Sequence, residues 1–342
     1  MSEASMDKTD KIIVPGRVSL VVASYNHAGF LNRRMDSLIA QTYEDIEIVV
    51  IDDCSPDNSV DILRDYEDHP KVNLIIRKEN GGWVTVSNQG IDVSTGEYVL
   101  FANCDDSCGP TMVERLVAAM QSSEKTGIAF CRSYMVDEND AVLGDDFTVR
   151  SADFRAYCAA DVVIPKDQAN RFLLHSCVIP NLSACLFRRQ CFEDHGNLSA
   201  EYRVCCDWDL FFRIAQTYDI SYVATALNNF RQHRKTIRSV TKDKVVYEEY
   251  FRLLLGQVNS LNLSARERMS ARTHVMYLWA VHVLVPSRNS WVNIPYHLRC
   301  VLIYDPASIV FLIPGFLKRV LEIGCKATGK MLRILKREAT QQ

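Results

Sequence analysis

The first 135 residues alternate between short apolar runs and amphipathic stretches, and this alternation limits the possible folds more than any other feature. The apolar runs are the expected strands, at residues 18–24, 46–53, 72–78, 98–103 and 127–133. The stretches between them have the spacing of helices with one buried face, at residues 31–40, 59–66, 84–93 and 111–121. Apolar strands that are separated by helices form parallel sheets with both faces covered. The sequence therefore predicts an α/β fold with a mostly parallel sheet.

The second half of the chain is less regular. From about residue 137 to residue 167 the periodicity fades, which indicates an elaborated loop region or a change of strand direction. Residues 179–189 and 220–227 again resemble strands, and residues 206–218 resemble a helix. Beyond residue 242 we expect helices.

Polar residues follow four of the expected strands. They are Ser24, Tyr25 and Asn26; Asp52 and Asp53; Asn80, Gly81 and Gly82; and Asn103, Cys104, Asp105 and Asp106. Ligands of parallel sheets bind outside the carboxyl ends of the strands. These four groups should therefore meet at one edge of the sheet and form its ligand site.

Composition and charge exclude several classes of protein. The net charge of −3 argues against a nucleic-acid-binding protein. The twelve cysteines include no C-x-x-C pair, so neither a zinc ribbon nor a dithiol redox site is expected, and Cys131, Cys185 and Cys300 are expected as small buried side chains. The polar N-terminus lacks the apolar segment of a signal peptide, which favours a cytoplasmic protein with reduced thiols.

Asp105 and Asp106 form an adjacent pair of carboxylates directly behind a strand. Oxygen ligands of this kind suit Mg²⁺ or Mn²⁺ held together with substrate phosphates. The alternative is an ordinary turn after a strand, because Asn and Asp are common turn residues.

The chain resembles the family 2 glycosyltransferases, which are inverting sugar transferases with the GT-A fold. The segment VSLVVASYNHAGFLNRRMDSLIAQTYEDIEIVVIDDCSPDNS resembles the family's opening, and ENGGWVTVSNQGI, GEYVLFANCDD and CDWDLFFRIA follow in the family's order. The resemblance covers roughly residues 18–235. It implies a GT-A domain at residues 18–240, with a nucleotide-sugar-binding half at 18–107 and an acceptor half at 108–240. A polar tail at 1–17 and a helical extension at 241–342 flank this domain.

The resemblance also implies roles for individual residues. It assigns the donor nucleotide to Ser24, Tyr25, Asn26, Asp52, Asp53, Asn80, Gly81, Gly82, Asn103, Cys104 and Asp105. Asp53 matches the residue that hydrogen-bonds the base, typically uracil, and Asp52 supports it. Without the family, Asp52 and Asp53 are explained equally well as the start of a turn.

The metal motif departs from the family pattern at one position. Asn103 stands where the family often has the first Asp of a D-x-D motif. An amide oxygen is a weaker metal ligand than a carboxylate, so Asp105 is expected to make the direct contact. Asp106 is either a second ligand or a residue that fixes the loop.

Asp207 matches the family's catalytic base, and Cys206 stands where Glu often precedes it. Leu210, Phe211 and Ile214 continue a stripe on the same helix face, which supports an inward position for Asp207. The alternative is that Asp207 only caps the helix.

The segment FRQHRKTIRS resembles a basic, histidine-containing loop of the family. His233 is a candidate ligand of the metal or the diphosphate, and Arg231, Arg234 and Lys235 are candidate phosphate contacts. The alternative for His233 is a surface or packing role.

The C-terminal segment has two explanations. Residues 301–317 are apolar but interrupted by Asp305, Pro306 and Pro314, so a transmembrane helix is not favoured. From Phe311 onward, seven Lys and Arg stand against two Asp and Glu. This segment either lies on anionic lipid at the inner face of the cell membrane or packs on the catalytic domain.

The sequence therefore predicts an inverting, Mg²⁺- or Mn²⁺-dependent transferase that moves a sugar from a nucleotide-diphosphate donor, expected to be a UDP-sugar. The expected acceptor is a hydroxyl of a saccharide or lipid-linked acceptor in surface polysaccharide synthesis. A rival is a non-catalytic nucleotide-sugar-binding or assembly subunit, which the departures Asn103 and Cys206 support. A nucleotidyltransferase would need a Gly-rich, basic phosphate loop, which SYNHAGF does not provide.

Overall fold

The computed structural model describes residues 12–179, 181–233, 240–283 and 293–321. Its contacts divide the chain into two compact units. The first consists of residues 1–202 and 206–236, and the second of residues 203–205 and 237–342.

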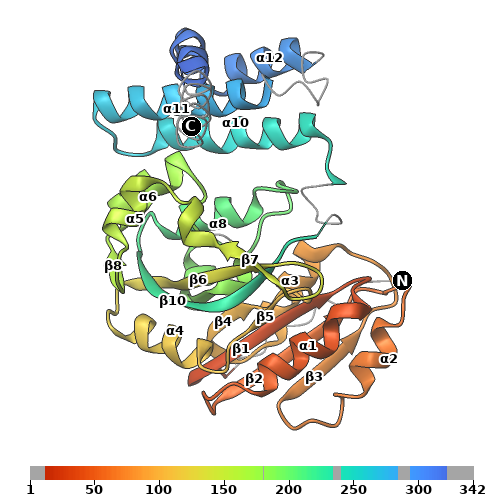
Figure 1. Ribbon diagram of the computed structural model, residues 1–342. Coiled ribbons are helices and arrows are strands. Elements are labelled where there is room, and N and C mark those ends of the chain that lie inside the picture. Colours follow the sequence, from red (N-terminus) through yellow and green to blue (C-terminus); the bar gives the residue numbers. More distant parts are fainter. Residues whose placement is uncertain (1–11, 180, 234–239, 284–292, 322–342) are drawn as a thin grey trace, which may run out of the picture. The chain divides into compact units, whose positions relative to one another are not determined.

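The first unit is built on one sheet, seen in Figure 1. Its main strand order is β3 (Val72–Ile76), β2 (Ile46–Asp52), β1 (Val14–Ser24), β4 (Gly96–Phe101), β9 (Cys185–Arg188), β6 (Thr126–Val136), β10 (Asp219–Arg231) and β5 (Ser107–Cys108). Two further strands pair outside this path, β7 (Val142–Asp145) with β6 and β8 (Val162–Ile164) with β10.

Strand directions confirm the predicted α/β fold. The strands β3, β2, β1 and β4 are parallel, as are β6 and β10, whereas β9 runs antiparallel to both of its neighbours. The change of direction expected within residues 137–167 is present, because β7 and β8 are both antiparallel to the strands they join. The strand expected at residues 179–189 is shorter, and follows a 3₁₀ turn, η2 (Leu182–Ala184).

Helices cover both faces of the sheet. The helices of the first unit are α1 (Ala28–Ile39), α2 (Ser59–Arg64), α3 (Trp83–Val93), α4 (Met112–Gln121), α5 (Ala152–Tyr157), α6 (Lys166–His175), α7 (Gln190–His195) and α8 (Cys206–Ile214), with the 3₁₀ turn η1 (Asp146–Val149). The buried side chains of α1, α2 and α4 share one core with alternate residues of β1 and β2. Val86 of α3 packs with Val49 and Ile51 on the opposite face. Cys131 and Cys185 are buried in this unit, as expected.

Gly90 brings α3 against the sheet. A Cβ atom added there would lie 2.2 Å from Cγ1 of Val21 in β1, closer than any packing allows. The absence of a side chain at Gly90 therefore sets the distance between α3 and β1.

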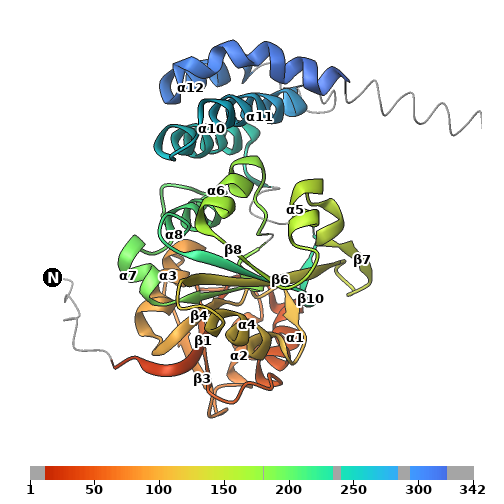
Figure 2. The same cartoon turned by 90° about the vertical axis from the view of Figure 1, so that its left-hand side faces the viewer.

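The second unit is helical, as predicted, and Figure 2 shows its helices gathered together. It contains α10 (Asp243–Ser260), α11 (Ala265–Val283), α12 (Ile294–Tyr304) and the 3₁₀ turn η5 (Pro306–Phe311). The buried carboxylate of Glu249 accepts the backbone N–H groups of Arg203, Val204 and Cys205 at 2.8–3.1 Å. One turn of α10 is therefore tied to a segment more than forty residues earlier in the chain.

The described residues include no helix with the length and apolar character needed to cross a membrane. Residues 322–342, which hold most of the basic C-terminal charge, lie outside the described residues. Both explanations of that segment therefore stay predictions.

We expect Gly90→Ala to lower the free energy of unfolding by about 1–3 kcal/mol, because the new methyl group forces α3 away from β1. Gly29→Ala in α1 is the matched control, since nothing lies within 4 Å of an added Cβ there. The control should gain up to about 1 kcal/mol from helix propensity. Urea unfolding of both variants measures the difference, and equal stabilities would contradict the packing at Gly90.

Candidate functional site

The four polar groups predicted from the strand ends meet at one edge of the sheet. Ser24 at the end of β1 pairs in register with Asp52 at the end of β2, and Asp52 pairs with Ile76 at the end of β3. Ala102, which follows β4, donates its N–H to Val21 of β1 at 2.7 Å. Parallel pairing therefore brings together residues that are far apart in the sequence.

Asp52 is buried and holds the turn that follows β2. Its carboxylate accepts the hydroxyl of Ser24 at 3.1 Å, and the N–H and hydroxyl of Ser55 at 2.8 and 2.6 Å. The Ser55 hydroxyl also accepts the N–H of Asn26 at 3.0 Å. Ser24 and Asp52 thus act as supports that join the ends of β1 and β2.

Asp53 is buried and holds the glycine loop. Its two carboxylate oxygens accept the N–H groups of Gly81 and Gly82, each at 2.8 Å, and Arg77 Nε lies 3.0 Å from Oδ1. Asn80 donates its side-chain amide to the Asp53 carbonyl at 3.3 Å. Gly82 has a φ of +83°, a conformation that favours glycine. The structure therefore gives Asp53 a structural task in addition to the base contact implied by the family.

Tyr25 and Asn26 are exposed at the end of β1, where a ligand can reach them. Asn26 has a φ of +57°, which turns the chain sharply before α1. After β4, Asn103 is half-buried and donates its N–H to the Ser183 hydroxyl at 3.1 Å, while Cys104 is buried. Cys104 therefore fills space beneath the loop.

His27, Asp105 and His233 form a cluster whose ligand atoms all lie within 4.8 Å of one another. His233 Nε2 lies 2.8 Å from Asp105 Oδ2. Burial acts to raise the pKa of Asp105, but the hydrogen bond from His233 and the nearby imidazoles outweigh it and leave that pKa below its usual range. The same hydrogen bond raises the pKa of His233. Asp105 is thus poised as an anion beside two imidazole rings.

Asp105 and His233 are predicted metal ligands from the sequence, whereas His27 is not among the predicted residues. His27 directly follows the polar residues at the end of β1, and this position in the sequence could have indicated that it lies at the site. The proximity of His27 to Asp105 and His233 is seen only in the folded chain.

Phe30 in α1 is the common support of this cluster. Its ring centroid lies 6.2 Å from that of His27 and 6.0 Å from that of His233. The Arg231 guanidinium lies over the same ring, at 4.7 Å from its centroid. One apolar side chain therefore limits the positions of both imidazoles.

Asp106 lies outside the cluster of His27, Asp105 and His233. It is buried, and its Oδ1 accepts the N–H of Arg231 at 2.8 Å. Burial, followed by the charge of Asp105, raises the pKa of Asp106 to about 7. Of the two roles left open by the sequence, this position favours support of the loop over direct metal ligation.

Arg231 is buried, and its position does not support the predicted phosphate contact. Its guanidinium donates to the carbonyls of Asp105 and Asp137 at 2.6 and 2.5 Å and to Asp140 Oδ1 at 2.6 Å. All of these acceptors belong to the protein, so Arg231 is assigned to holding the loop after β4. The other two predicted phosphate contacts, Arg234 and Lys235, lie outside the described residues.

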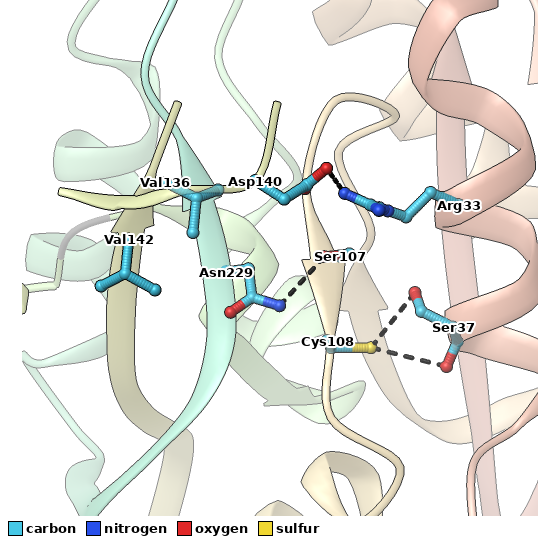
Figure 3. A pocket seen from close by; sticks show the side chains of 8 residues that line it. All are labelled: Arg33, Ser37, Ser107, Cys108, Val136, Asp140, Val142 and Asn229. Atoms are coloured by element: carbon cyan, nitrogen blue, oxygen red, sulfur yellow. Dashed lines mark hydrogen bonds and ion pairs between the residues drawn. The ribbon is translucent and has the colours of Figure 1, made fainter. Parts of the chain in front are cut away.

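Two cavities adjoin this arrangement. The first has a volume of about 290 Å³, and Ser37 and Cys108 are among the residues that line it. Arg33 and Asp140, which form an ion pair, also line this cavity (Figure 3). A larger open cavity of about 640 Å³ is lined by Asp137, Glu138, Asn139, Gln232 and His233. His233 thus borders both the histidine–aspartate cluster and an open space.

Asp207 lies in the first turn of α8 and is half-buried. Its Oδ1 accepts the N–H of Trp208 at 2.7 Å. Burial and neighbouring charges, including that of Asp207, raise the pKa of Cys185 at the start of β9. Because β9 is antiparallel to β4, its start lies near the carboxyl end of β4.

Other residues of α8 are committed to the structure. Leu210, Phe211 and Ile214 are fully buried, as the predicted stripe requires. Asp209 forms an ion pair with Arg213 at 2.8 Å. Asp209 is therefore less suited than Asp207 to a chemical role.

We expect Asp53→Ala to lower the free energy of unfolding by about 2–4 kcal/mol without any nucleotide present, because two N–H groups and Arg77 lose a buried anionic partner. The exposed Asp68→Ala is the control and should change stability by less than about 0.5 kcal/mol. Thermal melts of the ligand-free proteins test this. If Asp53→Ala melts at the same temperature as the wild type, Asp53 does not stabilise the ligand-free fold, and only a ligand-binding role would remain for it.

Comparisons with known proteins agree with this architecture. The family model for glycosyl transferase family 2 matches residues 19–196, more than half of the 342-residue chain. An uncharacterised glycosyltransferase of Nostoc is 34% identical over 137 residues, which are 40% of this chain and 40% of that protein. One of Rickettsia typhi is 26% identical over 260 residues, which are 75% of this chain and 76% of that protein.

Several matches cover only part of the relative. Those to proteins of Nostoc, Escherichia coli, Rickettsia felis and Bacillus subtilis span 34–40% of the relatives' own lengths.

Solved structures share the fold. The crystal structure of S. aureus TarS 1–349 in complex with UDP-GlcNAc aligns with a TM-score of 0.65 at 16% identity, over 91% of this chain and 92% of that one. The mostly parallel sheet flanked by helices is thus a GT-A fold. Because the family model matches more than half of the chain, the chain belongs to glycosyl transferase family 2.

Proposed function

We propose that this protein is an inverting glycosyltransferase that transfers a sugar from a nucleotide-diphosphate donor, a UDP-sugar, to an acceptor hydroxyl. The observation that carries the proposal is the meeting of four polar strand ends at one sheet edge in a chain of this family. Among solved structures with this fold, TarS binds UDP-GlcNAc, which supports a uridine nucleotide as the first donor to test.

The donor nucleotide is proposed to bind at the ends of β1 and β2 and on the glycine loop. Tyr25 and Asn26 are exposed there, and Gly81 and Gly82 have no side chains to keep a ligand from the backbone. Asp53 and Asp52 keep these segments in place, because their carboxylates accept hydrogen bonds from the loops around them. The nucleotide would therefore enter a site whose loops are already held.

A divalent cation is part of the proposal, and the residues present fit one. Asp105 and His233 offer an anionic oxygen and an imidazole nitrogen 2.8 Å apart, beside His27. A cation held there would supply neutralisation of charge on the departing diphosphate. Arg231 supports this corner because it binds the Asp105 carbonyl.

Asp207 is proposed as the general base that accepts the proton of the acceptor hydroxyl as its oxygen attacks the anomeric carbon. Half-burial at the start of α8, with Leu210 and Phe211 buried behind it, is compatible with this role. Attack opposite the leaving diphosphate gives inversion at that carbon. Asp207 needs only to hold the proton while the bond to the nucleotide breaks.

The acceptor is proposed to be a saccharide or lipid-linked hydroxyl used in surface polysaccharide synthesis, on the cytoplasmic side of the membrane. Support comes from the family alone. Residues 137–205 and the C-terminal helices are the proposed regions of acceptor selection.

Screening nucleotide sugars tests the donor. We expect UDP-sugars with Mn²⁺ to raise the melting temperature and to be hydrolysed slowly in the absence of acceptor, since bound ligand stabilises the folded state. GDP- and CMP-sugars at equal concentration are the controls. If no nucleotide sugar is bound or hydrolysed, the proposed function is wrong.

Asp207→Asn tests the base. We expect kcat to fall by about 10²–10⁴-fold while the affinity for UDP stays unchanged, because an amide cannot accept the proton. Asp209→Asn is the matched control on the same helix; it should lose stability with its Arg213 ion pair but keep turnover within about ten-fold. If Asp207→Asn keeps the kcat of the wild type, Asp207 is not the general base.

A further inference from the structure

We propose that His27, Asp105 and His233 together form a two-histidine, one-carboxylate site that binds a divalent transition-metal ion in preference to Mg²⁺. That these three residues bind a cation is argued from their geometry alone. That this cation serves the sugar donor rests on the proposed function. The new element is His27, which would supply a third protein ligand.

The position of His27 suits metal binding. Its Nδ1 lies 2.6 Å from the carbonyl oxygen of Tyr25, and a carbonyl can only accept a hydrogen bond. In the neutral ring the proton is therefore on Nδ1, and Nε2 keeps its lone pair. Histidine ligands of metals usually donate their second nitrogen to a carbonyl or carboxylate in this way, which fixes both tautomer and ring orientation.

The remaining two ligands are already beside His27. The ligand atoms of the three residues lie within 4.8 Å of one another, and the ring centroids of His27 and His233 are 5.8 Å apart. His233 Nε2 lies 2.8 Å from Asp105 Oδ2, so the two ligand atoms already face each other at the position that a cation would occupy between them. All three residues are half-buried, and the exposed fraction of the side chain is 23% for Asp105 and 6% for His233, so the protein restrains these ligands while solvent still reaches Asp105.

The restraint comes from Phe30 and Arg231. Phe30 contacts both imidazoles, and Arg231 binds the backbone carbonyl of Asp105 and lies over the Phe30 ring. The three ligands come from the segments that follow β1, β4 and β10, and these two side chains link all three segments. The site is therefore positioned before a cation arrives.

The composition of the site determines the preferred metal. Mg²⁺ favours oxygen ligands, whereas imidazole favours transition metals, and affinity for nitrogen-rich sites rises from Mn²⁺ to Co²⁺ and Ni²⁺. Asn103 removes one carboxylate from this corner and His27 adds a nitrogen. Two nitrogens and one carboxylate oxygen shift the preference away from Mg²⁺ and leave positions for phosphate oxygens.

The test measures metal binding directly. Co²⁺, Mn²⁺ and Mg²⁺ are each titrated into the full chain, with and without UDP, by calorimetry, and bound Co²⁺ is also followed by its visible absorption. We expect wild-type protein to bind Co²⁺ and Mn²⁺ more tightly than Mg²⁺, and His27→Gln to bind both transition metals about 10–100-fold more weakly. Pulsed electron paramagnetic resonance of bound Mn²⁺ should show nitrogen coupling that decreases in the variant.

Two further variants sharpen the result. His195→Gln makes the same change at a histidine whose Nε2 lies 2.6 Å from the Thr217 hydroxyl, and it should bind metal as the wild type does. His27→Asp replaces the nitrogen by a carboxylate and should shift the preference toward Mg²⁺ while metal binding is kept. Thermal melts of each variant confirm that it is folded.

The outcomes separate the two proposals. If His27→Gln binds Co²⁺ and Mn²⁺ like the wild type, or if the wild type prefers Mg²⁺, the inference is wrong even when a UDP-sugar is turned over. If His27→Gln loses Co²⁺ affinity but no nucleotide sugar is bound or hydrolysed, the cation site stands and the proposed function fails.

Discussion

The buried guanidinium of Arg231 joins the segments from which the candidate site is built. It binds the carbonyls of Asp105 and Asp137 and the carboxylate of Asp140, and it lies over Phe30. A buried charge is costly unless its partners replace the lost water, and here two carbonyls, one carboxylate and an aromatic face do so. The end of β10, the loop after β4 and the turn between β6 and β7 are thereby held together.

The acidic residues at this edge have different tasks. Asp52 and Asp53 are buried acceptors for backbone N–H groups and hydroxyls, and they keep the loops after β1, β2 and β3 in place. Asp106 is also buried and accepts from the Arg231 backbone. Asp105 differs from these three carboxylates because it is half-buried, and it lies beside the imidazoles of His27 and His233. Asp52, Asp53 and Asp106 therefore hold the loops of the site in place. Because these hydrogen bonds are present without a ligand, the geometry of the site does not depend on one.

The structure changes the interpretation of Asn103 and Cys206, the two departures from the family pattern. Asn103 suggested a weakened metal corner, and together with Cys206 it supported a non-catalytic subunit. His27 offers a replacement ligand within reach of Asp105, so the loss of one carboxylate does not imply the loss of the metal. Cys206 is buried at the start of α8, where a carboxylate would need a hydrogen-bonding or charged partner.

The order of strands and helices, the parallel direction of the first four strands and the polar character of their ends were determined by the sequence, because the apolar period and the strand-end composition are local. Only the tertiary structure decided which polar residues touch. His27 and His233 are separated by 206 positions in the chain, and their proximity depends on how β1 and β10 end around Phe30. The burial of Arg231 likewise depends on acceptors from two distant segments, the loop after β4 and the turn between β6 and β7. Its basic charge suggested a phosphate contact, whereas the fold uses that charge internally. Contacts of this kind arise from packing between elements, and the local pattern that predicts each element carries no information about them.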